Sequence, residues 1–323
     1  MKKKLLLIPI LIIMAALIIN PARYIRSINE GLMIFAISVL PALFPFFFFT
    51  KLLTALGVAG NISYYMQKPV SKLYNSPGPA GYILIMSIMS GYPIGAKLIA
   101  DFYDMNAITS KEAKRVSAFT SSSGPLFILG TVGSSILINY KAGLIILISH
   151  YLATLLNGFI YRGKTEANTL SAIKLPPVGY DKALSESVYS AIISILTVGS
   201  YIALFNLIGD ILTDIKLLPL VDKGLELLLN LVKLPPTLSC GISYSLIEMT
   251  RGCIYLSQSG ASIKVIAPLV AFSVTFGGLG IAIQSLTYLT KCKVPPLYYI
   301  TTKLSQSVIA FVICLLLCLV IPL

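Results

Sequence analysis

The stretch SGYPIGAK, residues 90–97, interrupts an apolar segment that would otherwise suit a lipid bilayer. The residues before it, PAGYILIMSIM (79–89), carry no charge. A helix that only spanned the membrane would avoid such an insertion, because proline removes a backbone donor, glycine weakens a helix and a charge at bilayer depth is costly. We therefore predict a helical hairpin over 79–102 that enters and leaves the membrane on the same side.

The composition is that of a membrane protein. Of the 323 residues, 56% are hydrophobic and only 11% are charged, and the mean hydropathy is +0.87. Soluble proteins carry about 25% charged residues. The net charge of +13 lies mostly between apolar runs, where basic residues orient a protein and favour anionic lipid. The chain is therefore expected in a lipid bilayer as a multi-pass protein, and not on nucleic acid.

Apolar stretches that cross a bilayer need about 20 residues. Seven stretches qualify, namely 4–20, 31–56, 113–138, 141–161, 186–209, 262–290 and 297–322. The first is interpreted as a retained helix, with a cleaved signal sequence as the alternative. A second interrupted segment, 237–259, matches the first hairpin, and a shorter amphipathic stretch precedes each hairpin, at 61–75 and 217–234. The predicted fold is all-α and polytopic, with about seven transmembrane helices and two re-entrant hairpins.

Charge asymmetry between the loops sets the predicted orientation. With the N-terminus in the cytoplasm, fifteen basic residues lie inside and seven outside, which is the direction that the positive-inside rule requires. Of the remaining three, Lys97 and Arg251 fall at the hairpin tips and Lys303 lies inside the last span.

An internal repeat divides the chain. ISVLPALFPFFFFTKL (37–52) aligns with ISILTVGSYIALFNLI (193–208), and AFTSSSGPL (118–126) aligns with AFSVTFGGL (271–279). Each copy would contain three crossings, an odd number, so the second copy is predicted to be inverted. The predicted organisation is an N-terminal helix and loop (1–30), a first repeat (31–162), a linker (163–185) and an inverted second repeat (186–323). Inverted repeats with broken helices at mid-membrane are typical of secondary transporters.

The two hairpin tips are candidate binding sites. Broken helices leave backbone groups unpaired and direct helix N-termini at a ligand. At the first tip Lys97 would supply a charge for an anion, or would only extend towards the surface. At the second tip, IEMTRG (247–252), Arg251 would bind a substrate carboxylate and Glu248 a coupling proton or cation, or the two would pair with each other.

Two predicted spans are broken by SSSGP (121–125) and TFGGLG (275–280). Serines and glycines there would line the same binding cavity as the hairpin tips, or would be ordinary helix-packing residues. The candidate substrate-binding residues are Ser90, Gly91, Tyr92, Pro93, Gly95, Lys97, Ser121, Ser122, Ser123, Gly124, Glu248, Thr250, Arg251, Thr275, Gly277, Gly278 and Gln284.

Few residues suggest catalysis. His150, the single histidine, lies within a span and would either be held by a neighbouring helix or act in a proton relay. The five cysteines form no CxxC pair and suggest neither a disulfide framework nor a metal site. The sequence has no P-loop, no GxSxG and no nucleotide fingerprint. We therefore expect no enzyme, no catalytic residue, no bound metal and no cofactor apart from a coupling proton or sodium.

Five segments in order, SVLPALFPFFFF, SGYPIGAKLIADFY, SSSGPLFILGTVG, IEMTRG and FGGLGIAIQ, resemble the sporulation integral membrane protein family called YlbJ or SpoVV. The resemblance covers residues 30 to 322. It implies a duplicated Gate domain (a nucleoside recognition domain), similar to the core of concentrative nucleoside transporters, and by that analogy a trimer. It also implies a role in endospore formation, in the mother-cell or outer forespore membrane, with dipicolinate as the transported anion.

The leading functional hypothesis is thus a secondary carrier or facilitator for a small organic anion such as dipicolinate. One alternative is a sporulation membrane protein that assembles or regulates a complex without transport. Another is a nucleoside-like or ion carrier of the Gate superfamily, although the first tip has Tyr-Pro-Ile where nucleoside carriers have glutamine, threonine and glutamate. A membrane-embedded enzyme is a further hypothesis, for which Glu248 and His150 would be the available groups.

Overall fold

The computed structural model describes residues 2–163 and 179–323. Every regular element in these ranges is a helix, which confirms the predicted all-α fold. Five helical segments within the described ranges are long and apolar enough to cross a membrane, judged by length and composition: Pro21–Ala55, Tyr140–Ile160, Tyr180–Asp214, Ile263–Leu289 and Pro296–Val320. These segments expose many leucine and isoleucine side chains on their outer surfaces, as expected of helices that contact lipid.

The first part of the chain is more helical than the sequence predicted. Helix α1 (Lys2–Ile19) is followed by α2 (Pro21–Ile34), the π-helix η1 (Phe35–Val39) and α3 (Leu40–Ala55). The span predicted to begin at residue 31 therefore begins at Pro21. Hydropathy does not detect this polar start. The Asn20 side chain caps the helix there by accepting a hydrogen bond from the Arg23 N–H at 3.4 Å. The π-helix lies directly before Pro41, whose missing N–H disrupts regular α-helical hydrogen bonding.

The first half of the chain continues through α4 (Val58–Tyr74), α5 (Pro79–Ser90), α6 (Ile94–Asp104), α7 (Ser110–Ser117), the π-helix η2 (Phe127–Ile136) and α8 (Tyr140–Ile160). The predicted hairpin over 79–102 is present as α5 and α6, which pack against each other. The predicted span 113–138 is interrupted, as the SSSGP stretch predicted. Helix α7 ends at Ser117, and no regular helix resumes until Pro125, so this span is broken over a longer stretch than SSSGP alone.

The second half repeats this order of elements. It contains α9 (Tyr180–Asp214), α10 (Leu217–Leu231), α11 (Leu238–Ile247), α12 (Met249–Ser257), α13 (Ile263–Phe276), α14 (Gly278–Leu289) and α15 (Pro296–Val320). Helix α9 is longer than the predicted span 186–209. Most of the predicted linker 163–185 lies outside the described residues, and the predicted repeat boundaries remain a prediction.

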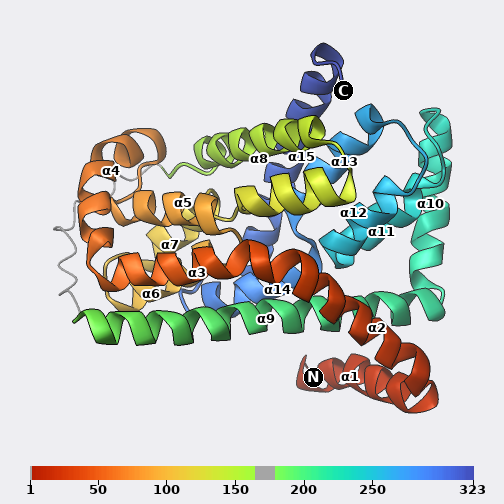
Figure 1. Ribbon diagram of the computed structural model, residues 1–323, viewed down its shortest axis with the longest axis horizontal. Helices are drawn as coiled ribbons and strands as arrows, with labels where there is room; N and C mark the ends of the chain where they lie inside the picture. Colours follow the sequence, from red (N-terminus) through yellow and green to blue (C-terminus); the bar gives the residue numbers. More distant parts are fainter. Residues whose placement is uncertain (1, 164–178) are drawn as a thin grey trace.

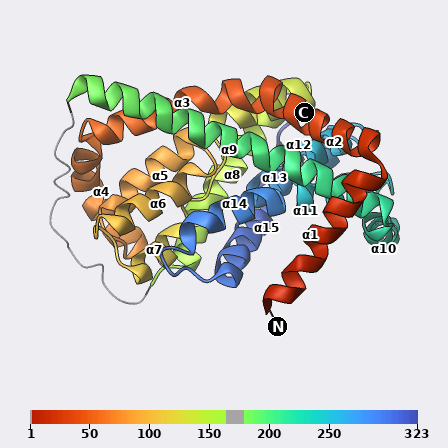
Figure 2. The same ribbon diagram turned by 90° about the horizontal axis from the view of Figure 1, so that it is seen from below.

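Corresponding elements of the two halves pack against each other. Helix α3 contacts α9, and α8 contacts α15. Each hairpin also reaches across, because α6 contacts α14 while α12 contacts η2. Helices α4 and α10 lie at opposite ends of the long axis in both views (Figures 1 and 2). The hairpins that follow them therefore enter from opposite ends, which is the arrangement that an inverted repeat predicts.

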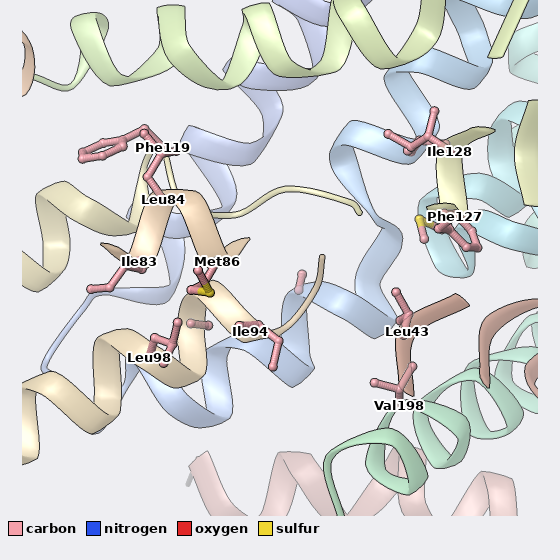
Figure 3. Close-up of a cluster of buried hydrophobic side chains, with 14 of the residues drawn as sticks. Leu43, Ile83, Leu84, Met86, Ile94, Leu98, Phe119, Phe127, Ile128 and Val198 are labelled. Atoms are coloured by element: carbon pink, nitrogen blue, oxygen red, sulfur yellow. The ribbon is translucent and has the colours of Figure 1, made fainter. Parts of the chain in front are cut away.

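The interior between the hairpins is mainly apolar. On one side of Figure 3, Ile83 and Met86 of α5 face Ile94 and Leu98 of α6 within one buried cluster. On the other side, Leu43 of α3 and Val198 of α9 lie beside each other, with Phe127 of η2 above them. Those last three residues form part of the wall of the cavity described below.

Candidate functional site

The interruptions of the two hairpins and the two broken spans meet near the centre of the molecule. In the first half, Gly91 has a φ of +80°, and a Cβ on it would lie 2.6 Å from the backbone nitrogen of Gly124. In the second half, Gly278 has a φ of +74°, and its Cβ would lie 2.9 Å from the carbonyl oxygen of Ile247. Each hairpin tip therefore packs directly against the broken span of its own half, and both contacts require glycine.

His150 joins the two broken spans to each other. Its Nε2 accepts the Ser123 N–H at 2.9 Å, and its Nδ1 lies 2.8 Å from Thr275 Oγ1. Because the Ser123 N–H is a donor, Nε2 must be the unprotonated nitrogen, and Nδ1 carries the proton that it donates to Thr275. The imidazole is fully buried. His150 thus has a structural role that bridges the two halves, which was one of the two alternatives for it.

A small cavity of about 40 Å³ lies where the four interruptions meet. Its walls come from both hairpin tips, both broken spans and helices α3, η1 and α9. The lining residues are Val39, Leu43, Tyr92, Ser123, Phe127, Val198, Tyr201, Ile202, Glu248, Met249, Thr250, Gly277, Gly280, Ile281 and Gln284. Six of the predicted site residues are among them. The volume is enough for only a few water molecules, so the structure is closed around this site.

Two polar side chains of the cavity, Gln284 and Thr250, each have a buried atom without a hydrogen-bond partner within the described residues. Gln284 is only 2% exposed, and within the described residues its Nε2 has no hydrogen-bond partner. Thr250, also 2% exposed, makes no hydrogen bond of good geometry through its hydroxyl, although it lies next to the Glu248 carboxylate. Leaving a buried amide donor unpaired is costly, by about 1–3 kcal/mol. A ligand that accepts a hydrogen bond from Gln284 would remove this cost.

Behind the cavity lies a buried lysine that the site prediction missed. Lys303 is 2% exposed, and its Nζ donates to Tyr92 Oη (2.8 Å), the Ser121 carbonyl (3.0 Å) and Gln306 Oε1 (3.0 Å). Tyr92 in turn donates to the Thr275 carbonyl at 2.8 Å. Lys303 therefore lies one hydrogen-bonded residue away from the cavity. A lysine inside a 25-residue apolar helix was the signal that could have identified it.

Glu248 caps the second half of its own hairpin. Its carboxylate accepts the N–H groups of Thr250 (3.1 Å) and Arg251 (2.8 Å) at the start of α12. The helix N-terminus that was expected to face an anionic substrate is therefore already occupied by a carboxylate of the chain. The alternative in which the Glu248 and Arg251 side chains pair is not what the structure shows, because Arg251 bonds to Glu248 through its backbone only.

The Arg251 side chain does not face the cavity. Its guanidinium forms a fork with Asp210, with Nη2 3.1 Å from Oδ1 and Nη1 3.2 Å from Oδ2. It also donates to Asn206 (2.8 Å) and Tyr255 (2.8 Å), and lies 3.6 Å from Glu30. Arg251 thus connects the second hairpin to α9 and α2, and its donors are used within the protein.

Lys97 also lies apart from the cavity. Its Nζ donates to Ser190 (3.0 Å) and Ser194 (2.8 Å) of α9, in a separate small pocket that Lys51 and Asp101 also line. The structure therefore does not bring Lys97 and Arg251 together, and neither candidate charge lies in the central cavity.

The remaining predicted residues support the site from behind. Ser90 is hydrogen-bonded to Thr50, Ser121 to Tyr299, Ser122 to Ser87, and Thr275 to His150. Gly91, Pro93, Gly95, Gly124 and Gly278 form the turns and close backbone contacts of the interruptions. The hydroxyl groups that were predicted to contact substrate are thus largely engaged within the protein.

The fold and the site together define a multi-pass helical membrane protein with two similar halves whose broken helices enclose a small central cavity. The sporulation integral membrane protein YlbJ of Bacillus subtilis (strain 168) is 28% identical to this chain over 330 residues, covering 95% of this chain and 80% of the relative. The resemblance to the YlbJ family is thereby confirmed, and the chain is an integral membrane protein. No protein-family model and no solved structure matches it.

Proposed function

We propose that this protein is a membrane carrier for a small organic anion, with dipicolinate as the substrate during endospore formation. The relative is a sporulation integral membrane protein, which supports a role in sporulation. The choice of dipicolinate rests on the family resemblance. The coupling ion would be a proton or sodium, and the working state would be one in which the hairpin tips separate enough to admit the anion.

The observation that carries the proposal is the unpaired amide of Gln284 in a cavity built from all four interruptions. Its N–H group would donate to a carboxylate oxygen of the substrate. Aromatic and aliphatic side chains such as Phe127 and Ile281 would contact the pyridine ring. Small-molecule sites usually have a mainly apolar wall with a few polar groups.

Size also bears on the proposal. A cavity of about 40 Å³ is too small for a pyridine dicarboxylate, so binding would require one of the hairpins to move. The tips are suited to this movement because each is a short non-helical turn between two helices. In carriers whose sites lie at interrupted helices, access alternates through rocking or gating movements around the site.

The test is uptake of dipicolinate by liposomes that contain the purified protein. Gln284→Leu removes the unpaired amide at similar volume, and Gln258→Leu, at an exposed position after α12, is the matched control. We expect Gln284→Leu to weaken dipicolinate binding by roughly tenfold or more, as loss of a hydrogen bond to a charged group does. The control should retain wild-type uptake.

Two outcomes would contradict the proposal. If wild-type protein that is folded and correctly inserted moves no dipicolinate under a proton or a sodium gradient, a non-transporting role in a sporulation complex becomes the better hypothesis. If uptake occurs but Gln284→Leu leaves affinity unchanged, the protein is a carrier whose site lies elsewhere.

A further inference from the structure

Lys303 is a buried basic group without an acidic partner in its immediate surroundings. All three hydrogen-bond partners of its Nζ are neutral oxygens. Within residues 2–163 and 179–323, no carboxylate lies within ion-pair distance of it. An unpaired ammonium in a protein interior is strongly disfavoured. A second charge close by, or loss of the proton, would remove this penalty.

We propose that Lys303 is the proton-binding residue of the carrier, which takes up a proton when an anion occupies the central cavity and releases it when the cavity is empty. This inference rests on the proposed function. The proton binds the lone pair of Nζ from the solution on one side and leaves the same atom towards the other side. Anion and proton would then cross together.

The partners of Lys303 are suited to both forms of the side chain. An ammonium donates three hydrogen bonds, whereas a neutral amine donates two and accepts one. The Ser121 carbonyl and Gln306 Oε1 are acceptors in either case, and the Gln306 amide nitrogen is held separately by Thr154 at 2.7 Å. The Tyr92 hydroxyl can accept from the ammonium or donate to the amine. Both forms are therefore satisfied without movement of a heavy atom.

The same hydroxyl connects Lys303 to the cavity and to a broken span. With the ammonium present, Tyr92 donates its proton to the Thr275 carbonyl at 2.8 Å. With the neutral amine, that proton turns to Nζ and the carbonyl of Thr275 loses its donor. Thr275 lies two residues before the break at Gly277. Tyr92 also lines the cavity. Rotation of its hydroxyl group therefore links the ligand site, the protonation of Lys303 and the broken span.

Other titratable groups near Lys303 have fixed partners. Helix α15 packs against α8, α13 and α14. From α8, His150 is held at both nitrogens. On α15 itself, Tyr299 is hydrogen-bonded to Ser121.

The charged groups on the elements around Lys303 lie at the cavity or at helix ends, and the Tyr151 hydroxyl of α8 donates to the Ile88 carbonyl at 3.0 Å. Glu248 faces the cavity from the second hairpin, and its carboxylate is held by two backbone N–H groups. Helices α13 and α14 contain no acidic residue and no histidine; Lys264 and Tyr288 lie in their end turns. Glu248 is therefore the residue against which the assignment of the proton to Lys303 has to be tested.

The experiment measures proton uptake on binding of dipicolinate to the purified full-length protein. Calorimetric titrations at one pH, in buffers of different ionisation enthalpy, give the number of protons taken up for each anion bound. We expect about one proton in the wild-type protein and about none in Lys303→Arg, because arginine keeps its charge at every accessible pH. Lys303→Met should also lose the uptake, and Lys291→Met, at an exposed loop position, should keep it.

The outcomes separate this inference from the proposed function. Binding without proton uptake in the wild type would overturn the inference and leave the carrier intact. Proton uptake that persists in both Lys303 variants and disappears in Glu248→Gln would assign the proton to Glu248. That result would also overturn the inference. If folded wild-type protein does not bind dipicolinate at all, the proposed function fails and the inference falls with it. Lys303→Met serves as the folding safeguard, since it matches the neutral amine in charge and approximate size, whereas Lys303→Arg keeps a permanent charge in the buried site.

Discussion

Replacing Arg251 should destabilise the protein without acting on the ligand site directly. The side chains of Arg251 and Asp210 are only 14% and 13% exposed, and they pair through two nitrogen–oxygen contacts of 3.1 and 3.2 Å. Removing one partner of a buried ion pair costs about 3–5 kcal/mol. Hydrogen bonds from Ser27 and Tyr244 to Asp210 would remain. We therefore expect the lower end, about 3 kcal/mol, for Arg251→Met.

The assay is thermal unfolding in detergent for Arg251→Met, Asp210→Leu and the double variant. Since both charges are absent from the double variant, its loss of stability should be smaller than the sum of the single losses, with a coupling of roughly 1–3 kcal/mol. Dipicolinate affinity, measured on the fraction that is folded, should stay near that of the wild type. A variant Arg251→Met that unfolds like the wild type but no longer binds dipicolinate would refute this reasoning and return Arg251 to the substrate site.

Two further predictions concern the interruptions. Gly278→Ala forces a Cβ into a left-handed backbone conformation and against the hairpin tip, so we expect a loss of at least about 1–2 kcal/mol in unfolding free energy. Gly224→Ala on α10, where a Cβ meets nothing within 4 Å, should be neutral or stabilising by up to about 1 kcal/mol in the same melting assay. His150→Phe removes both bonds of the imidazole and leaves the Ser123 N–H unpaired. We expect it to cost about 2 kcal/mol or more, and an unchanged melting temperature would contradict the bridging role.

Sequence patterns were sufficient for the helices and their interruptions, because both depend on local composition. The hairpin turn at SGYPIGAK and the break at Gly277 and Gly278 follow from residues that oppose a regular helix in any surroundings. Boundaries were less accurate. The span from Pro21 begins with a polar turn that hydropathy does not register, since capping and an Arg26–Glu30 pair stabilise it.

The partners of charged residues were beyond the reach of the sequence. Arg251 lies next to Glu248 along the chain, yet its side chain pairs with Asp210, 41 residues earlier. Which carboxylate an arginine meets depends on how helices cross, and periodicity does not define that. Lys303 shows the opposite case: its depth in an apolar span indicated a function, but only the folded chain reveals that Tyr92 connects it to the cavity.

The hydrogen bond between His150 and Thr275 limits how such a carrier could alternate between its two sides. His150 and Ser123 belong to the same half, so a mechanism that rocks one half against the other would break the bond to Thr275 in every turnover. That bond would have to re-form in the buried interior before the next cycle. Movement of the hairpin tips leaves it intact. The imidazole therefore holds the two broken spans together as one rigid unit. The hairpins are then the elements that move during transport.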